Sequence, residues 1–215
     1  MNYVIARKKI SNYVKIMITN INIKNFKSIK SLELNCARVN VFIGKPNTGK
    51  SNILEAIGLY SLKHDTTKNK KFNSISNYIR AEDLTNIFYD NVIDDKISVE
   101  CKADDIEDAF TIEYVNSEFE LVCSDLKRNR ELLRFALDKD FRNKKSPVIN
   151  FYQSLFVRFY RFNRLYEYPS KEIDYLNPPF GDNLLKLINT RKEIKNFVID
   201  LFNEYGYKFQ SFEDI

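Results

Sequence analysis

Several residue types are absent or scarce in this 215-residue chain, and each scarcity excludes a class of structure. There is no tryptophan, there is one histidine (His64), and the three cysteines form no Cys-x-x-Cys pair. A structural zinc site needs four closely placed ligands and a disulfide framework needs paired cysteines. We therefore expect neither, and interpret the thiols as reduced in a cytoplasmic protein. No apolar run reaches 18 residues, so no membrane span is predicted.

Glycine is also scarce, and no two of the five glycines are adjacent: Gly44, Gly49, Gly58, Gly181 and Gly206. Any motif that contains Gly-Gly is therefore excluded from this sequence. The composition, 44% hydrophobic and 29% charged, is that of an ordinary globular protein with a core. The net charge of +5 suits an acidic ligand or a nucleic-acid backbone and requires neither.

One stretch, residues 39–52, has the pattern of a phosphate-binding loop. The β-branched and aromatic run 39–43 predicts a buried strand, and the apolar spacing after Lys50 predicts a helix. Between them, Gly44 to Ser51 fits Gly-x-x-x-x-Gly-Lys-Ser, the Walker A pattern. A helix start presents unpaired N–H groups and partial positive charge to phosphate oxygens. The predicted ligands are therefore ATP and Mg²⁺.

Each position of the loop has a chemical reason. Gly44 and Gly49 allow tight curvature, Lys50 would reach the β- and γ-phosphates, and the Ser51 hydroxyl would ligate Mg²⁺. Asn47 tolerates a left-handed backbone, and Pro46 removes one N–H donor. The predicted nucleotide-binding residues are Gly44, Lys45, Pro46, Asn47, Thr48, Gly49, Lys50, Ser51 and Asn52.

Two further predicted strands precede the loop, at residues 14–23 and 29–34, with a turn at Asn25-Phe26-Lys27-Ser28. This order, followed by Gly49-Lys50-Ser51-Asn52-Ile53-Leu54-Glu55-Ala56-Ile57, resembles the opening of SMC and RecF-type ATPases. These are ABC-like heads of DNA-repair and genome-maintenance proteins and of related OLD-type defence proteins. The likeness extends to short stand-alone RecF-like bacterial ATPases, also called AAA ATPases, and covers residues 14–60.

The resemblance implies an α/β fold with α+β character: a P-loop NTPase with an ABC-ATPase-like N-terminal lobe, an antiparallel β-layer and an inserted helical region. The expected parts are residues 1–62, 63–124 and 125–215, forming one continuous lobe. It also implies that Lys27 approaches the nucleotide, the alternative being an exposed turn lysine. Such heads use a glutamine to couple Mg²⁺ to a helical arm, and Gln153 is the candidate. Pro46-Asn47 replaces the Asn-Gly that is frequent in the family.

The remaining pattern predicts strands at 97–101, 109–115 and 118–123, the last two joined by a turn at Asn116-Ser117. Residues 63–77 are polar and basic and predict a surface loop. Four acidic residues within 104–108 fit either a metal site or a solvated loop. Near the end of the sequence, helices are predicted at 183–189 after Asp182 and at 194–205, with a Thr190–Glu193 capping box and a stop at Gly206.

Two basic stretches are candidates for nucleic-acid contact. A helix predicted from Ser124 or Asp125 to residue 143 carries basic residues throughout 127–145. A second stretch, 151–168, interleaves aromatics with Arg158, Arg161 and Arg164, as in surfaces that stack single-stranded bases. An ordinary charged helix face and a core strand explain the same patterns.

The catalytic elements of this ATPase class are not found. A hydrophobic strand ending in Asp-Glu (Walker B) positions Mg²⁺ and the attacking water. The nearest run, Phe197 to Asp200, lies in a helical pattern and continues with Leu201. A Ser-Gly-Gly signature is excluded by the glycine spacing. No catalytic residue is therefore identified.

We expect the chain alone to bind nucleotide weakly, to hydrolyse it negligibly and to expose an apolar face where a second lobe packs. That lobe belongs either to a longer ATPase or to a separate polypeptide, and a homodimer partner would complete the site. Two other functions fit parts of the pattern. One is a nucleic-acid-binding module with a vestigial phosphate loop. The other is a small kinase or GTPase, although no Asn-Lys-x-Asp run is present.

Overall fold

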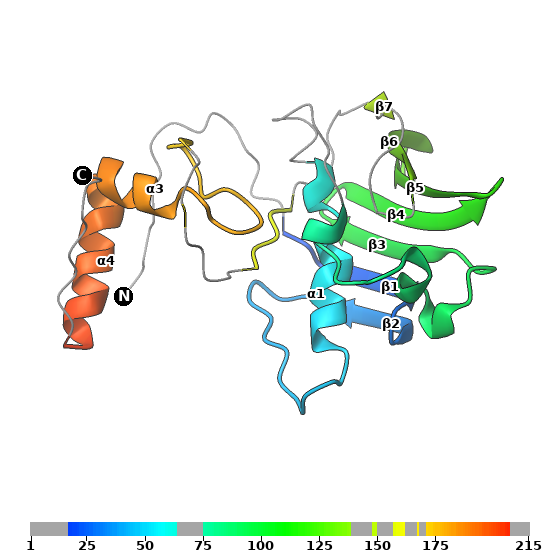
Figure 1. Ribbon diagram of the computed structural model, residues 1–215, viewed down its shortest axis with the longest axis horizontal. Coiled ribbons are helices and arrows are strands. Elements are labelled where there is room, and N and C mark those ends of the chain that lie inside the picture. The colour runs from blue at the N-terminus through cyan, green and yellow to red at the C-terminus, as the bar shows by residue number, and fades with distance from the viewer. Residues whose placement is uncertain are drawn as a thin grey trace. The chain divides into compact units, whose positions relative to one another are not determined.

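The computed structural model describes residues 17–63, 75–138, 148–149, 157–161, 167 and 171–206. The chain divides into two units: residues 14–159 form the larger one, and residues 1–13 together with 160–215 form the smaller. The larger unit contains a β-sheet, the phosphate-loop segment and the helix that follows it (Figure 1). The smaller unit contains two helices near the C-terminal end of the sequence.

The sheet of the larger unit has seven strands in the order β2-β1-β3-β4-β5-β6-β7, and every neighbouring pair is antiparallel. The strands are β1 (Asn20–Phe26), β2 (Ile29–Asn35), β3 (Ile97–Ala103), β4 (Ile106–Val115), β5 (Glu118–Asp125), β6 (Arg130–Leu137) and β7 (Val148–Ile149). The predicted antiparallel layer is therefore confirmed, and the first hairpin belongs to the same sheet. Of the predicted strand 14–23, residues 17–19 are irregular and 14–16 lie outside the described residues.

Two-residue turns set the register of two hairpins. Phe26 pairs with Ile29, so Lys27 and Ser28 form the turn between β1 and β2, within the predicted segment. Asn116 and Ser117 join β4 to β5 with φ values of 52° and 63°. Two consecutive left-handed residues match the right-handed twist of the flanking strands, which confirms the predicted turn.

Helix α1 (Lys50–Gly58) packs against the sheet and supplies part of its core. Ala56 and Leu59 are buried together with Ile21 and Ile23 of β1. The Tyr60 ring meets the edge of Phe110 with 4.8 Å between ring centroids. Three short 3-10 turns follow at Ile75–Asn77 (η1), Leu84–Ile87 (η2) and Tyr89–Asn91 (η3). The predicted helix after the phosphate loop is therefore confirmed, and its apolar side faces the sheet.

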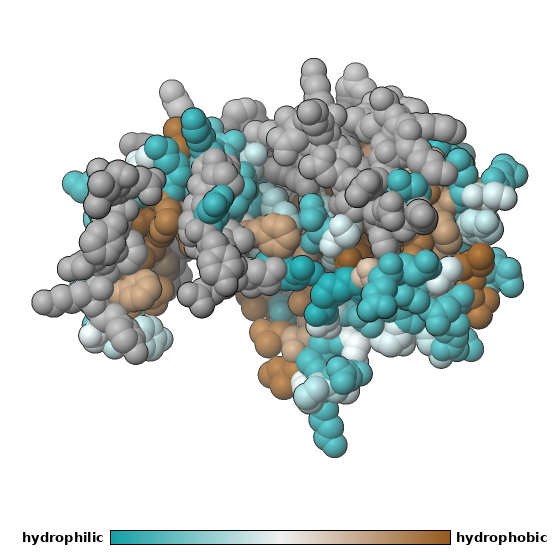
Figure 2. Space-filling model, in the orientation of Figure 1, coloured by the Kyte–Doolittle hydropathy of each residue, from teal (hydrophilic) through white to brown (hydrophobic). Residues whose placement is uncertain are grey.

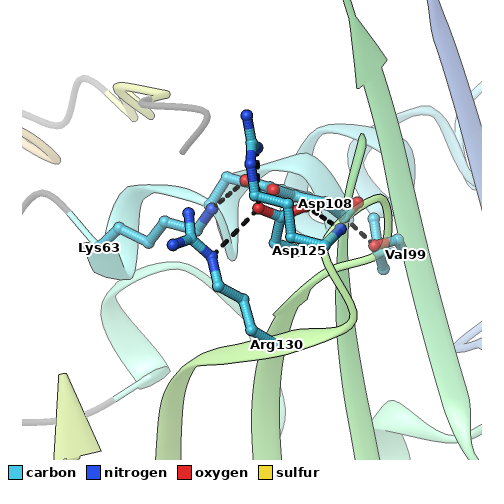
Figure 3. A network of polar contacts seen from close by, with 7 residues as sticks. Lys63, Val99, Asp108, Asp125 and Arg130 are labelled. Carbon is cyan, nitrogen blue, oxygen red and sulfur yellow. Dashed lines mark hydrogen bonds and ion pairs between the residues drawn. The ribbon is translucent and has the colours of Figure 1, made fainter. Parts of the chain in front are cut away.

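An ion pair between Lys63 and Asp108 lies in the core, where the basic pattern of residues 63–77 had predicted a surface loop (Figure 3). Both side chains are fully buried, and 2.5 Å separates Lys63 Nζ from Asp108 Oδ2. The Tyr60 ring centroid lies 5.2 Å from the ammonium nitrogen. The surface-loop prediction is therefore wrong for Lys63. Its ammonium group can be buried because an opposite charge and hydrogen bonds accompany it. The acidic residue Asp108, likewise, is in strand β4 and not in a solvated loop.

The helix predicted over 125–143 is wrong. Residues 126–129 form a turn, and β6 pairs with β5 along residues 130–137. Leucine, arginine and glutamate favour helices, but Leu132 and Leu133 are both fully buried although they are adjacent. The register of β5 and β6 shifts here between Cys123 and Ser124, so Leu132 has no partner on β5. Both leucines belong to the hydrophobic core, and this packing outweighs local propensity. Residues 130–137, expected to be part of the inserted helical region, therefore belong to the sheet.

The smaller unit contains α3 (Leu184–Thr190) and α4 (Lys192–Glu204), close to the predicted helices. The predicted caps are wrong: Asn183 and Arg191 are the N-cap residues, and neither makes a side-chain capping bond. The Asn183 amide instead binds the backbone of residues 172, 175 and 177. Gly206, at φ 77°, follows α4 as expected for a stop. Among the described residues, no helix is long and apolar enough to cross a membrane.

Candidate nucleotide-binding site

The segment that leads to the phosphate loop is irregular and exposed, so the prediction of a buried strand at 39–43 is wrong. Val39, Val41 and Ile43 are 74%, 74% and 89% exposed. Figure 2 shows hydrophobic surface beside the hydrophilic tip that the loop forms. A strand buries its side chains only when other strands flank it and a layer covers it. No flanking strand for this segment is present in the part of the chain that the structure describes. The expected exposed apolar face is thus found here.

The loop itself has the backbone conformations that its sequence predicts. Asn47 has φ 61° and Gly49 has φ 82°, both left-handed. At Gly44, an added Cβ would lie 3.3 Å from Thr48 Oγ1 and 3.8 Å from Lys50 Nζ. The loop therefore curls tightly around the position of Gly44, where any larger side chain would intrude. Residues 43–48 are all exposed, so this face of the loop is open to a ligand.

The Lys50 side chain folds back across this loop. Its Nζ donates to the Lys45 carbonyl oxygen at 2.5 Å and to Thr48 Oγ1 at 3.1 Å. The Thr48 hydroxyl in turn donates to the same carbonyl at 2.9 Å. An ammonium group held over a ring of backbone atoms is placed to neutralise an anion that binds within the ring. The Lys50 ammonium group therefore lies against the loop, and its contact with the β- and γ-phosphates stays a prediction.

Helix α1 begins directly after the loop, with Gly49 as its N-cap and no capping side chain. The first backbone bonds are those of Asn52 and Ile53 to the Gly49 carbonyl, at 2.9 and 3.2 Å. The amides of Lys50 and Ser51 precede the first position that can bond within the helix. Unpaired N–H groups and the helix dipole favour a phosphate at this end. The residues present therefore fit a nucleotide phosphate, with Ser51 in the first turn as the candidate Mg²⁺ ligand.

The turn between β1 and β2 supports the end of the loop. Ser28 Oγ accepts from Asn52 Nδ2 at 2.8 Å, and it lies 2.8 Å from the position that a Cβ on Gly49 would occupy. A side chain at residue 49 would therefore collide with Ser28 and would also strain a left-handed backbone. Gly49 is required for this close approach as well as for its φ angle.

Lys27 lies on the same turn, but its ammonium group is paired with a carboxylate. Nζ lies 2.5 Å from Glu55 Oε2 and donates to the Arg80 carbonyl oxygen at 2.5 Å. Arg80 Nε lies 2.6 Å from the other Glu55 oxygen. Sequence reasoning missed Glu55 and Arg80 as residues of this region. The sequence did contain a signal for Glu55. It is an acidic residue four positions after Ser51, on the same face of the predicted helix, and its neighbours are apolar.

Three arginines in the described part of the first basic stretch are paired with carboxylates. Arg128 and Arg130 both contact Asp125, whose side chain is 1% exposed. Arg134 pairs with Glu120 and Glu131. Burial raises the pKa of Asp125, but hydrogen bonds from Arg128 outweigh it, so this pKa is lowered overall. These arginines therefore stabilise a hairpin and do not form a basic helix face.

The second basic stretch is only partly described. Residues 157–161 have no regular secondary structure, and the Arg161 guanidinium lies 5.9 Å from the ring centroid of Phe180. Gln153 and Arg164, together with residues 64–74 (which include His64) and 139–147, lie outside the described residues. Within the described ranges, no three acidic, histidine or cysteine side chains are grouped as for a metal site. Among the described residues, Ser51 remains the candidate Mg²⁺ ligand.

Comparison with known proteins identifies the family of this chain. A model of the AAA ATPase domain family matches residues 17–211, which include the phosphate loop and all the described strands and helices. An uncharacterised protein of Methanocaldococcus jannaschii, MJECL10, is 49% identical over 45 residues. That match covers 20% of this chain and 20% of the relative. ATP binding and ATPase function accompany the family. By the extent of the first match, this chain belongs to the AAA ATPase domain family.

Proposed function

We propose that this chain is the ATP-binding lobe of a RecF- or SMC-like ATPase that acts in DNA repair, genome maintenance or phage defence. The observation that carries the proposal is the exposed loop from Gly44 to Ser51, with Lys50 folded over it and the first amides of α1 behind it. The amides and Lys50 would bind the β- and γ-phosphates of ATP, and Ser51 would ligate Mg²⁺. When bound, Mg²⁺ bridges these phosphates and neutralises charge.

A second lobe is part of this proposal. Val39, Val41 and Ile43 alternate along the segment that enters the loop, and all three are largely exposed. Alternation with period two is the pattern of a strand that buries one face. We propose that a strand of the second lobe, ending in Asp-Glu, pairs with this segment and brings its carboxylates to the phosphates. Phe197 to Asp200 does not serve as that strand, because these residues are in α4.

Nucleotide binding is tested by thermal unfolding of the full chain with and without Mg-ATP. Ligand at 100 times its Kd stabilises the folded state by about 2.7 kcal/mol. For a chain of this size we expect Tm to rise by about 5–11 °C. The control is Lys50→Ala, which removes an ammonium group outside the core and should abolish the shift. A shift of equal size in Lys50→Ala, or none in the wild type, contradicts ATP binding at this loop.

Hydrolysis is tested separately. We expect phosphate release by the chain alone to equal that of Lys50→Ala, because the second lobe would supply the Asp that positions Mg²⁺ and the Glu that polarises the attacking water. Steady turnover above this control would contradict the proposal.

DNA is the partner that the proposed family role requires, and a nucleic-acid-binding module with an inert loop is the competing function. The pairing of Arg128, Arg130 and Arg134 with carboxylates does not favour the competing function. Affinity for DNA without nucleotide, falling steeply with salt, would favour it.

A further inference from the structure

A buried carboxylate joins three segments beside the phosphate loop. Glu55 is 2% exposed and lies one helical turn after Ser51. Its two oxygens contact Lys27 Nζ at 2.5 Å and Arg80 Nε at 2.6 Å. The Arg80 backbone N–H also donates to Glu55 Oε2, at 3.2 Å. A single side chain of α1 therefore holds the β1–β2 turn on one side and the segment before η2 on the other.

The contacts close a ring, so the three segments restrain one another. Lys27 Nζ, besides meeting Glu55, donates to the Arg80 carbonyl oxygen. The neighbouring residue Ser28 accepts from Asn52 and touches the position of Gly49. Lys27 itself has a left-handed φ of 51°, a conformation that is unfavourable for a residue with a Cβ. The β1–β2 turn therefore keeps Lys27 in this left-handed conformation, and its Ser28 contacts the end of the phosphate loop.

Charge explains why the carboxylate matters for an anionic ligand. Two cations face one carboxylate here, and Lys50 lies in the adjacent loop. A triphosphate that binds at the start of α1 attracts every nearby cation, and long side chains move readily toward it. A buried carboxylate with bonds to both cations keeps Lys27 and Arg80 in place. Helix α1 and its first backbone amides then keep the same orientation whether or not the ligand is bound.

We propose that Glu55 is a positioning residue of the nucleotide site: through Lys27 and Arg80 it fixes the first turn of α1 in the orientation that binds phosphate. This inference rests on the proposed function, since it requires ATP at the loop. Glu55 does not touch the nucleotide. Loss of the Glu55 carboxylate should therefore weaken ATP binding indirectly: the first backbone amides of α1 are still present, but they are no longer held in the orientation that binds phosphate.

The chain offers a matched control for this test. Asp108 is a second buried carboxylate, and it pairs with Lys63 beyond the end of α1, away from the loop. Glu55→Gln and Asp108→Asn each remove one charge from a buried pair and should both lower Tm. Only Glu55→Gln should change affinity. A role in stability alone would lower Tm in both variants without affecting the Kd of the folded protein.

The experiment measures the Kd of Mg-ATP by titration calorimetry on the full chain, at a temperature where circular dichroism shows each variant folded. We expect Glu55→Gln to raise Kd roughly tenfold or more and Asp108→Asn to leave it within about twofold. Unchanged affinity in Glu55→Gln, or an equal rise in Asp108→Asn, overturns the inference. Should Glu55→Gln fail to fold, Arg80→Ala replaces it, because that side chain is 58% exposed. It should raise Kd about threefold, and no rise overturns the inference.

The wild type separates this inference from the proposed function. If it does not bind Mg-ATP, the proposed function fails and the inference with it. If the wild type binds and Lys50→Ala does not, while Glu55→Gln binds as well as the wild type, the inference alone fails.

Discussion

Removing one member of the buried Lys63–Asp108 pair should destabilise the protein more than removing any surface ion pair. Lys63→Met keeps most of the side-chain volume and removes the ammonium group, which leaves the Asp108 carboxylate buried without its charged partner. Breaking a buried pair in this way costs about 3–5 kcal/mol. Asp108→Asn leaves the Lys63 ammonium in the same position, and its cost should be similar.

The double variant distinguishes a paired interaction from two independent losses. Lys63→Met with Asp108→Asn removes both charges, so neither is left uncompensated in the core. We expect it to cost about as much as one single variant, so the coupling energy should equal the cost of the other single variant, about 3–5 kcal/mol. Lys102→Met is the surface control. Its pair with Glu107 is 3.0 Å long, but the lysine is 52% exposed, so the cost should stay below about 1 kcal/mol.

Urea unfolding followed by circular dichroism and tyrosine fluorescence measures these energies, because the chain has 13 tyrosines and no tryptophan. Costs of the two single changes that add within about 0.5 kcal/mol would refute the reasoning. So would a loss in Lys63→Met no larger than that in Lys102→Met.

Three further predictions concern the loop segment, a turn and the thiols. Ile43→Ser should change the unfolding free energy by less than about 0.5 kcal/mol, since Ile43 is 89% exposed; a larger loss in urea unfolding would show that the segment is packed. Ser117→Gly should raise the unfolding free energy by about 1 kcal/mol by relieving a left-handed residue at φ 63°, and equal stability would contradict this. Burial raises the pKa of Cys101 and Cys123 to about 12, from an ordinary 9.0. As pH rises, the thiols ionise in the unfolded chain before they ionise in the folded protein. The stabilisation from burying the neutral thiols is therefore complete below pH 9 and is lost as pH rises to about 12. Replacing both cysteines by alanine should reduce the fall of the unfolding free energy between pH 9 and about 12. An unchanged slope would contradict the raised pKa values of these thiols.

The phosphate loop was predictable because its chemistry is local. The tight curvature of this short segment requires residues such as Gly44, Asn47 and Gly49. The left-handed φ values at Asn47 and Gly49 confirm the conformations predicted there. The Asn116-Ser117 turn was predictable for the same reason. The helix expected at 125–143 was not, because β6 pairs with β5 and buries Leu132 and Leu133 in the core, which local propensity does not report.

The sequence by itself determined the order of the first hairpin, the loop and α1, since turn chemistry and apolar spacing act over a few residues. Tertiary structure decided which charges are buried. Lys63 meets Asp108 across 45 positions, and Glu55 meets Lys27 and Arg80 across 28 and 25. Tertiary structure also decided that Val39, Val41 and Ile43 are exposed. The physical reason is the same in both cases: the free energy of a charge or an apolar side chain depends on what distant segments place around it.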